Sequence, residues 1–425
     1  MSIAQKRLFF QGVVVTLALL ACEGVPERTT PTSAAPASTP QVAPATAAPI
    51  TAPVDVCGLG PGEPEDDDRV VLLGHPFGDQ PGTRGNEIRS MVLRSDGTLV
   101  DVGTRLDLGS PPERIVFTPS GRFALVAGKD GLVTLVEVLA PDELIIRDVV
   151  SVDPQGTADL VIHPDGRTAW LVRRDVRGAT SGIFTITIGC EGSLHVVPGH
   201  FGLRLAEALA LFPGDPDHAL LLGGQAVFYP VDDADLRLLV RDGETWRAVG
   251  AYDIFHDAVQ ASGIAVSPDG RTAVVPNASA FSDEGNQVVV LDVHMPPAQE
   301  PAGSGGLVER QRLRAVHDAA LARFSPDGAT VVLVQPEAGQ ISLLAADAAG
   351  HYRVVSTLAP GLATDLAIVQ RGAGTGLMVV PSVHPRLGSR VQVYRLEGPG
   401  RARLVDAVDL SAGHTEIPAA IGIRP

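Results

Sequence analysis

The feature that most constrains this chain is a short turn that recurs along it. VSPDGRTAVV begins at Val266 and FSPDGATVVLV begins at Phe324, so Ser-Pro-Asp-Gly stands twice between two apolar runs. Three further segments share this arrangement, and the five turn prolines are Pro119, Pro164, Pro213, Pro268 and Pro326, spaced by 45, 49, 55 and 58 residues. A degenerate copy from Asp365 keeps both apolar runs and the glycine. A period of this length indicates a repeat fold.

Each unit continues in the same way after its turn. Two further β-rich runs follow, for instance LVTLVEV from Leu132 and ELIIRDVVSV from Glu143. Four short strands per unit, bounded by Gly, Pro, Asp and Asn, are typical of a propeller blade. FGLRLAEALALF from Phe201 is the only stretch that could pass for a helix, and its alignment with the other copies favours a strand.

The two ends of the repeat region complement each other. Three strands, starting near Arg69, Glu87 and Leu99, precede the first full unit, and one more inner-strand copy, IPAAIGIRP, begins at Ile417. We expect this C-terminal strand to complete the first blade and close the ring, which removes exposed sheet edges. The sequence therefore predicts an all-β domain over residues 57–425, a seven-bladed β-propeller of four-stranded antiparallel blades.

The turn and strand pattern between Arg69 and Pro425 resembles the YVTN-type and lactonase-like seven-bladed propellers of exported bacterial proteins. The resemblance implies the fold. It says less about activity, because this family includes a few sugar lactonases and many proteins with no known chemistry.

The residues of the repeated turn are explained by the geometry of the turn itself. Proline presets φ near −65°, a short polar side chain can bond the local backbone, and glycine accepts a positive φ. This interpretation accounts for Asp165, Asp269 and Asp327 without a metal. One carboxylate per blade is too isolated to supply the six or more oxygens that Ca²⁺ requires.

The N-terminus is typical of an exported lipoprotein. Lys6 and Arg7 precede the apolar run LFFQGVVVTLALL, which is short for a membrane span and predicts a signal peptide over residues 1–21. LLAC, ending at Cys22, resembles the bacterial lipobox, which implies that Cys22 is acylated and becomes the first mature residue. An ordinary secretory signal with an incidental cysteine is the alternative.

Residues 22–56 form the predicted acylated cysteine and tether. The stretch from Thr29 to Pro53 consists almost entirely of Pro, Ala, Thr and Ser, which cannot bury a core and favours an extended, disordered chain. We expect a lipid-anchored protein of the bacterial cell envelope. Glu23 in place of Asp after the cysteine favours the outer membrane, at its periplasmic face or the cell surface.

The net charge limits which binding partners are expected, and the cysteine count indicates a disulfide. The net charge of −16 argues against nucleic acid and against an anionic membrane surface, which both require a basic face. With Cys22 assigned to lipid, Cys57 and Cys190 remain as a pair in an oxidising compartment. We expect a disulfide between them, with two free thiols as the alternative.

Polar residues gather at the loops that enter the innermost strands and at those that join the second and third strands. Propeller ligands usually approach the central channel from this face. The candidate ligand residues at the strand entrances are Asp159, Glu207, His256, Asp257, His317, Asp318, Asp365, His414 and Glu416. The connecting loops add His75, Arg173, Arg174, Asn277, Asp283, Glu284, His384 and Arg386.

Two interpretations of these residues compete. Histidines and carboxylates from different blades could bind a divalent cation or act as acid and base on a lactone. Alternatively, they could bond backbone groups and stagger one blade against the next. His-Asp-Ala occurs both at His256 and at His317, in adjacent blades, and this repetition favours packing.

The sequence favours binding over catalysis. It contains no Gly-x-Ser-x-Gly elbow, no His-Glu-x-x-His, no phosphate loop and no dinucleotide fingerprint. We therefore expect a monomeric propeller head that binds an envelope protein, a glycan or a small ligand. A lactonase-like hydrolase and an assembly scaffold are the alternatives. No cofactor is predicted, and a divalent cation in the channel stays an open alternative.

Overall fold

The computed structural model describes residues 57–60, 68–77, 84–152, 156–175, 181–223, 225–226, 229–230, 234–255, 259–279, 285–295, 306–314, 316–384, 388–410 and 420–425. The chain divides into two units, Met1–Pro53 and Val54–Pro425, and the described residues belong to the second. The predicted signal peptide, Cys22 and the tether lie outside them. Within the described residues, no helix is long and apolar enough to span a membrane.

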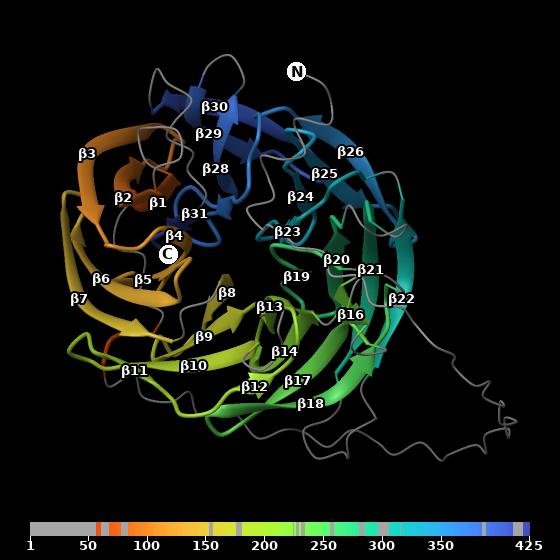
Figure 1. Cartoon of the computed structure of the whole chain (residues 1–425). Coiled ribbons are helices and arrows are strands. Elements are labelled where there is room, and N and C mark those ends of the chain that lie inside the picture. Colours follow the sequence, from red (N-terminus) through yellow and green to blue (C-terminus); the bar gives the residue numbers. More distant parts are fainter. Residues whose placement is uncertain are drawn as a thin grey trace, which may run out of the picture. The chain divides into compact units, whose positions relative to one another are not determined.

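Seven antiparallel sheets follow one another around a central axis, as the sequence predicts (Figure 1). The strands of blades 1 to 3, from the axis outward, are β31 (Ala420–Ile423), β1 (Arg69–Phe77), β2 (Arg84–Leu93) and β3 (Leu99–Asp107); β4 (Pro112–Phe117), β5 (Phe123–Gly128), β6 (Leu132–Ala140) and β7 (Glu143–Ser151); and β8 (Thr157–Ile162), β9 (Thr168–Arg173), β10 (Gly182–Ile188), β11 (Leu194–Val196) and β12 (Phe201–Gly202). In blade 3 the two short strands β11 and β12 both pair with β10 and share the outer position.

Blades 4 to 7 repeat the arrangement. Their strands are β13 (Ala206–Phe212), β14 (Asp215–Gly223), β17 (Leu236–Asp242) and β18 (Thr245–Tyr252); β19 (Ala265–Val266), β20 (Thr272–Asn277), β21 (Gln287–His294) and β22 (Gly306–Leu313); β23 (Leu321–Phe324), β24 (Val331–Gln335), β25 (Gln340–Ala346) and β26 (Tyr352–Leu358); and β27 (Ala367–Ile368), β28 (Leu377–His384), β29 (Gly388–Leu396) and β30 (Ala402–Asp409). A small hairpin, β15 (Gln225–Ala226) with β16 (Tyr229–Pro230), is inserted between β14 and β17. The stretch from Phe201 forms strands and no helix, as the alignment predicts, with a turn at Arg204 and Leu205 between β12 and β13.

The described residues form seven hydrophobic core clusters, and each cluster fills the space between two adjacent blades. The second strands are therefore buried on both faces, and all six residues of β5, FALVAG, are buried. The outermost strands face solvent on one side, so β26 is mostly exposed. This difference explains why the inner strands are near-continuous apolar runs, whereas the outer strands are mixed.

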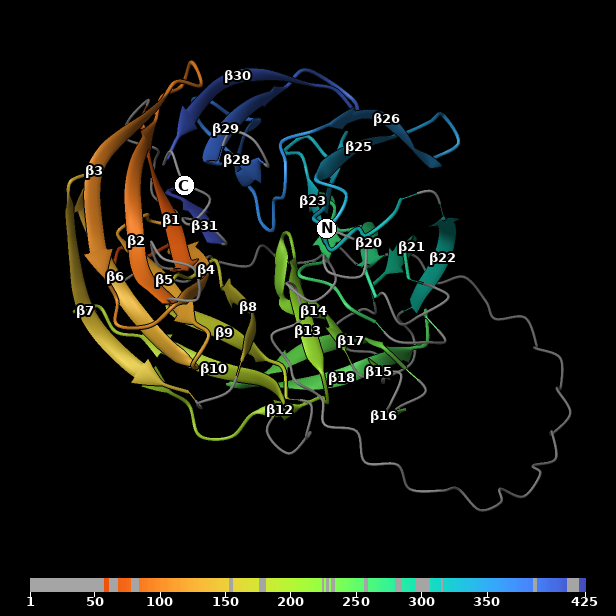
Figure 2. The same cartoon turned by 45° about the horizontal axis from the view of Figure 1, so that its top comes forward.

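The ring closes between blades 7 and 1, which Figure 2 shows as neighbours although they come from opposite ends of the propeller sequence. β31 pairs antiparallel with β1, with Leu73 opposite Ile421 and Val71 opposite Ile423. Ala420 and Ile421 are buried against neighbouring blades. The predicted closure is confirmed, and the closing strand covers Ala420–Ile423 of the predicted 417–425.

The repeated turn is held by its own side chains. In blade 5 the Ser267 hydroxyl donates to Asp269 Oδ1 (2.5 Å), which also accepts the N–H of Arg271 (3.1 Å). In blade 6, Ser325 and Asp327 make the same hydroxyl contact at 2.5 Å. The serine hydrogen bond is the main cause that lowers the pKa of each aspartate. These carboxylates are turn-forming groups, as the sequence interpretation holds.

A disulfide joins Cys57 to Cys190, with the two Cα atoms 5.0 Å apart. The neighbouring Leu59 is fully buried in the cluster between blades 2 and 3. Its carbonyl accepts the N–H of Ser120 (3.2 Å) in the blade 2 turn and lies against Gly166 in the blade 3 turn. Residues 57–60 therefore bridge the turns of these two blades.

Candidate functional site

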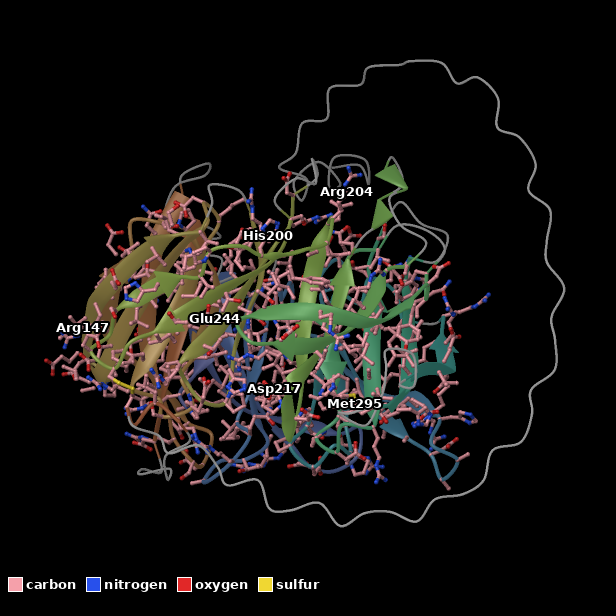
Figure 3. All side chains as sticks on the ribbon, turned by 90° about the horizontal axis from the view of Figure 1, so that it is seen from below. Arg147, His200, Arg204, Asp217, Glu244 and Met295 are labelled. Atoms are coloured by element: carbon pink, nitrogen blue, oxygen red, sulfur yellow. A yellow bond between two sulfur atoms is a disulfide. The ribbon has the colours of Figure 1, made fainter. Side chains whose placement is uncertain are left out.

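The propeller has two faces with different chemistry. The chain enters the innermost strands at one face, here named the entrance face, and leaves them through the repeated turns at the other, the turn face. Figure 3 shows the ring from the side: Arg204, just before β13, lies toward the entrance face, and Asp217 and Met295 lie toward the turn face. Most of the predicted site residues belong to the entrance face.

Asp159 and Asp365 tie adjacent blades together. The Oδ1 atom of Asp159 accepts the N–H of Leu160 (2.9 Å), and its Oδ2 atom accepts the N–H of Leu209 in blade 4 (3.1 Å). The carboxylate of Asp365 accepts the N–H of Leu366 (2.9 Å) and that of Ile421 in blade 1 (3.3 Å). Both side chains are only 7% exposed, and burial raises the pKa of both carboxyl groups. The staggering interpretation accounts for these two residues.

Two arginines accompany these carboxylates, and the sequence analysis missed them. Arg114 Nε lies 3.7 Å from Asp159 Oδ1, and Arg114 Nη2 donates to the Ser262 carbonyl (3.2 Å). Arg114 belongs to blade 2 and Ser262 precedes β19 of blade 5, so this side chain spans the channel. Arg323, on β23, opposes the burial effect on the pKa of Asp159 and of Asp365, as does Arg114.

A sequence signal for Arg114 exists. It stands five residues before the turn proline Pro119, as Asp159 stands five residues before Pro164. Alternation along a strand then places Arg323, three residues before Pro326, on the same side. Aligning each copy on its proline would therefore have found both arginines.

Glu207 and Arg174 form the second charged pair of the entrance face. Arg174 Nε lies 3.0 Å from Glu207 Oε1, and the Glu207 side chain is 6% exposed whereas that of Arg174 is 40% exposed. Burial raises the pKa of Glu207 to about 7, although Arg174 and Arg114 act in the opposite direction. A carboxyl group that titrates near neutral pH is suited to exchange a proton.

His317 and Asp318 differ in their surroundings. His317 is exposed, and its carbonyl accepts a hydrogen bond from Gln335 (2.7 Å). Asp318 has φ +57°, donates its N–H to Asn286 Oδ1 (2.7 Å) and accepts the N–H of Glu337. Burial raises the pKa of Asp318 to about 6, and the charge of Glu337 adds to the effect. Asp318 thus joins the loop before β23 to the β20–β21 and β24–β25 connections.

Asp235, which the sequence analysis did not select, makes a similar tie. It is fully buried, and its two oxygens accept the N–H groups of Ile254 and Phe255 at 2.9 Å each. Burial raises the pKa of Asp235 to about 7.

The remaining predicted residues contribute little to an open site. Arg173, His75 and Asn277 are buried, and Asn277 accepts the N–H groups of Gln260 (3.2 Å) and Ser279 (3.0 Å). The described part of the structure does not extend to His256, Asp257, Asp283, Glu284, Arg386, His414 and Glu416, nor to the side chain of His384. Among the described residues, no three His, Cys, Asp or Glu side chains are placed to hold a metal ion.

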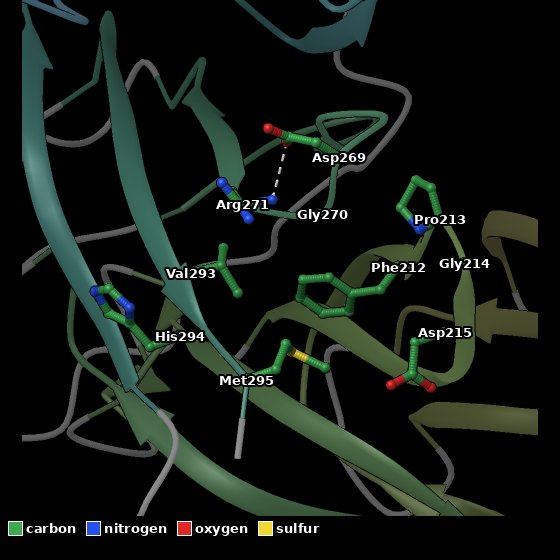
Figure 4. Close-up of a pocket in the computed structure, with 10 residues that line it drawn as sticks. All are labelled: Phe212, Pro213, Gly214, Asp215, Asp269, Gly270, Arg271, Val293, His294 and Met295. Carbon is green, nitrogen blue, oxygen red and sulfur yellow. Dashed lines mark hydrogen bonds between the residues drawn. The ribbon is translucent and has the colours of Figure 1, made fainter. Parts of the chain in front are cut away.

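A hollow of about 540 Å³ lies on the turn face between blades 4 and 5 (Figure 4). Phe212, Val293 and Met295 form its apolar part, and Asp215 and His294 are among the polar groups around it. Asp269, also at its edge, is engaged within its own turn. The hollow is separate from the charged groups of the entrance face.

Comparison with known proteins identifies the fold. No family model matches the chain, and a search of curated proteins found no match. Among solved structures, a candidate 6-phosphogluconolactonase from Bacteroides uniformis is 14% identical, with a TM-score of 0.63 over 84% of this chain and 100% of the other. The periplasmic gluconolactonase of Pseudomonas aeruginosa is 14% identical, with a TM-score of 0.60 over 84% and 99%. At this identity the likeness establishes a lactonase-like seven-bladed propeller fold.

Proposed function

We propose that this chain is a lipid-anchored protein of the bacterial cell envelope whose propeller binds a ligand at the entrance face without turning it over. The lipobox-like segment ending at Cys22 and the Pro-rich tether support the anchoring. An envelope protein, a glycan or a small ligand is the partner class, and we propose a monomeric head that needs no cofactor.

The observation that carries the binding proposal is that the carboxylates in the channel are already hydrogen-bonded to the backbone. Both oxygens of Asp159 and both oxygens of Asp365 accept backbone N–H groups from two blades. A carboxylate held in this way stabilises the ring and has little freedom to transfer a proton to a substrate. The arginines Arg114 and Arg323 balance the charge of these two groups in the channel.

Two arginines of the entrance face are accessible to solvent. Arg174 is partly exposed beside buried Glu207, and Arg204 is exposed just before β13. Such a surface favours a polar ligand, because guanidinium groups form charged hydrogen bonds that an apolar ligand cannot satisfy.

A lactonase-like hydrolase is the second candidate. It is favoured by the pKa of about 7 of Glu207 and by the fold shared with a gluconolactonase and a candidate 6-phosphogluconolactonase. In this alternative, Glu207 would exchange a proton with the substrate while Arg174 orients it.

Hydrolysis assays separate the two candidates. The full-length protein would be incubated with gluconolactone and with 6-phosphogluconolactone, in the presence of a chelator, Ca²⁺ or Zn²⁺. The binding proposal predicts that wild type and Glu207→Gln give the same rate as buffer alone. A wild-type rate well above buffer that falls at least about 100-fold in Glu207→Gln would instead establish a hydrolase, because general acid–base catalysis contributes about that much.

A further inference from the structure

The turn face carries a reversal of charge around the ring. In blades 3, 5 and 6 the residue after the turn proline is an aspartate: Asp165, Asp269 or Asp327. The aligned position in blade 7 is Arg371, and in blade 1 the residue before the turn proline is Arg424 instead of serine. Three turns therefore carry an aspartate, whereas the two turns where the ring closes carry an arginine.

Three arginines meet at this closure, and we name Arg69, Arg371 and Arg424 the seam arginines. The guanidinium of Arg69 donates to the carbonyls of Arg371 (2.6 Å), Arg424 (3.2 Å) and Ala373 (3.4 Å). It thereby joins the end of β31 to the turn of blade 7. Arg69 is 4% exposed, so this positive charge is held away from solvent.

Arg371 and Arg424 lie beside the turn of blade 2. Arg371 Nη2 donates to the carbonyl of Pro119 (2.9 Å). The aliphatic part and Nε of Arg424 pass over Gly121, where a Cβ atom would lie 2.6 Å from Arg424 Cγ. Because Gly121 has no side chain, the Arg424 side chain can pack directly against the backbone of this turn.

The side chains of Arg69 and Arg371 donate to backbone carbonyls, and none of the three seam arginines has an ion-pair partner among the described residues. None of the ion pairs between described residues includes any of the three. The Arg424 guanidinium makes no hydrogen bond to a described residue. Burial and the nearby charge of Arg371 both lower the pKa of Arg69.

We propose that Arg371 and Arg424, supported by the buried positive charge of Arg69, bind an oxyanion, a phosphate or carboxylate group, at the turn face where blades 7, 1 and 2 meet. Guanidinium groups present planar sets of N–H donors that match these anions. A bound anion would offset the mutual repulsion of the three cations and would connect the two ends of the ring. This site lies on the face opposite to the proposed ligand surface and does not depend on it.

Calorimetric titration of inorganic phosphate into the full-length protein at low ionic strength tests the site. We expect saturable binding of one phosphate per chain in the millimolar range or tighter. Arg424→Gln should weaken it about tenfold, which is the loss of one charged hydrogen bond. Arg424 is the residue to change first, because its side chain makes no hydrogen bond to the part of the chain that the structure describes.

Two comparisons make the result specific. Arg167→Gln removes an exposed arginine from the turn of blade 3 and should leave phosphate affinity within about twofold of wild type. Phosphate should also raise the melting temperature of wild type more than that of Arg424→Gln, because a ligand stabilises the state that binds it. Citrate in place of phosphate tests the carboxylate arm, and dihexanoyl phosphatidic acid tests whether a phospholipid headgroup is accepted.

The proposal has clear points of failure. Absence of saturable phosphate and citrate binding would overturn it, and would mean that the chain neutralises these arginines itself. Binding that is weakened equally by Arg167→Gln and Arg424→Gln would show general attraction to positive charge and would overturn it as well. Arg371→Gln, which should also weaken binding about tenfold, provides a second variant if Arg424→Gln folds poorly.

Discussion

Asp159 and Asp365 occupy equivalent positions in blades 3 and 7, and each carboxylate accepts one N–H from its own blade and one from the next. The repeat thus uses the same chemical tie at two separate places in the ring. The main role of these two carboxylates is therefore to stabilise the ring, and not to bind a ligand.

Replacing Asp159 with alanine should lower the free energy of unfolding by about 2 kcal/mol, because the buried N–H of Leu209 loses its acceptor. Asp365→Ala should do the same through Ile421. Urea denaturation measures the free energy of unfolding of both variants. The control is Asp142→Ala, at an exposed turn of blade 2, whose free energy of unfolding should stay within about 0.5 kcal/mol of wild type. If Asp159→Ala and Asp365→Ala were as stable as Asp142→Ala, the two carboxylates would not be ties.

Glu207 should make stability depend on pH. Its folded pKa of about 7 lies above the value for an unfolded chain, so the protonated form is favoured in the folded state. This contribution is fully present below about pH 4.5 and is lost as the pH rises through 7.

Urea denaturation of wild type and Glu207→Gln at several pH values isolates this effect. Between pH 4.5 and 8, wild type should lose up to about 3 kcal/mol more unfolding free energy than the variant, because glutamine does not titrate. Parallel profiles for the two proteins would show that folding does not raise the pKa of Glu207.

Two turn glycines provide a matched test of how residues 57–60 dock. Gly166 and Gly214 have φ +69° and +81°, so alanine is strained at both. A Cβ at Gly166 would overlap the Leu59 carbonyl, whereas one at Gly214 meets no described atom within 4 Å. Gly214→Ala should lower the free energy of unfolding by about 1 kcal/mol, because only the backbone is strained. Gly166→Ala should lower it by about 1–3 kcal/mol more than Gly214→Ala does, because the new methyl group also overlaps Leu59. Urea denaturation measures both variants. Equal losses would contradict the docking of Leu59 against blade 3.

The closing strand should be essential to the ring. Ile421 is 4% exposed and packs between blades 1 and 7, so Ile421→Ala should lower the free energy of unfolding by about 2–5 kcal/mol. Val308, on the outer strand of blade 5, is 53% exposed, and Val308→Ala should change it by less than about 0.5 kcal/mol. A small effect of Ile421→Ala would mean that the ring does not depend on this seam.

The fold was predictable because its signals are local. Proline and glycine mark five of the turns within four residues, and counting the turns locates the seam at β31. The charged contacts of the channel were harder to predict. Arg114 and Ser262 are 148 residues apart and meet only because blades 2 and 5 face each other across the axis.

For the candidate site residues, too, the sequence predicted which side chains are involved but not which groups they contact. Asp159 and Asp365 could be selected from the repeat, but which backbone groups they accept depends on the stagger between blades, which no single repeat encodes. The pKa of Glu207 arises from burial that the folded ring imposes. Local sequence therefore predicts these side chains but not their environment.

Photo-crosslinking tests the central claim, ligand binding at the entrance face, most directly. A photo-reactive amino acid would replace exposed Arg204 on the entrance face or exposed Asp217 toward the turn face, in full-length protein within intact cells. We predict a discrete crosslinked product from position 204 that is lost when Arg174→Gln is added, and none from position 217. Products from position 217 alone, or equal products from both positions, would contradict the account.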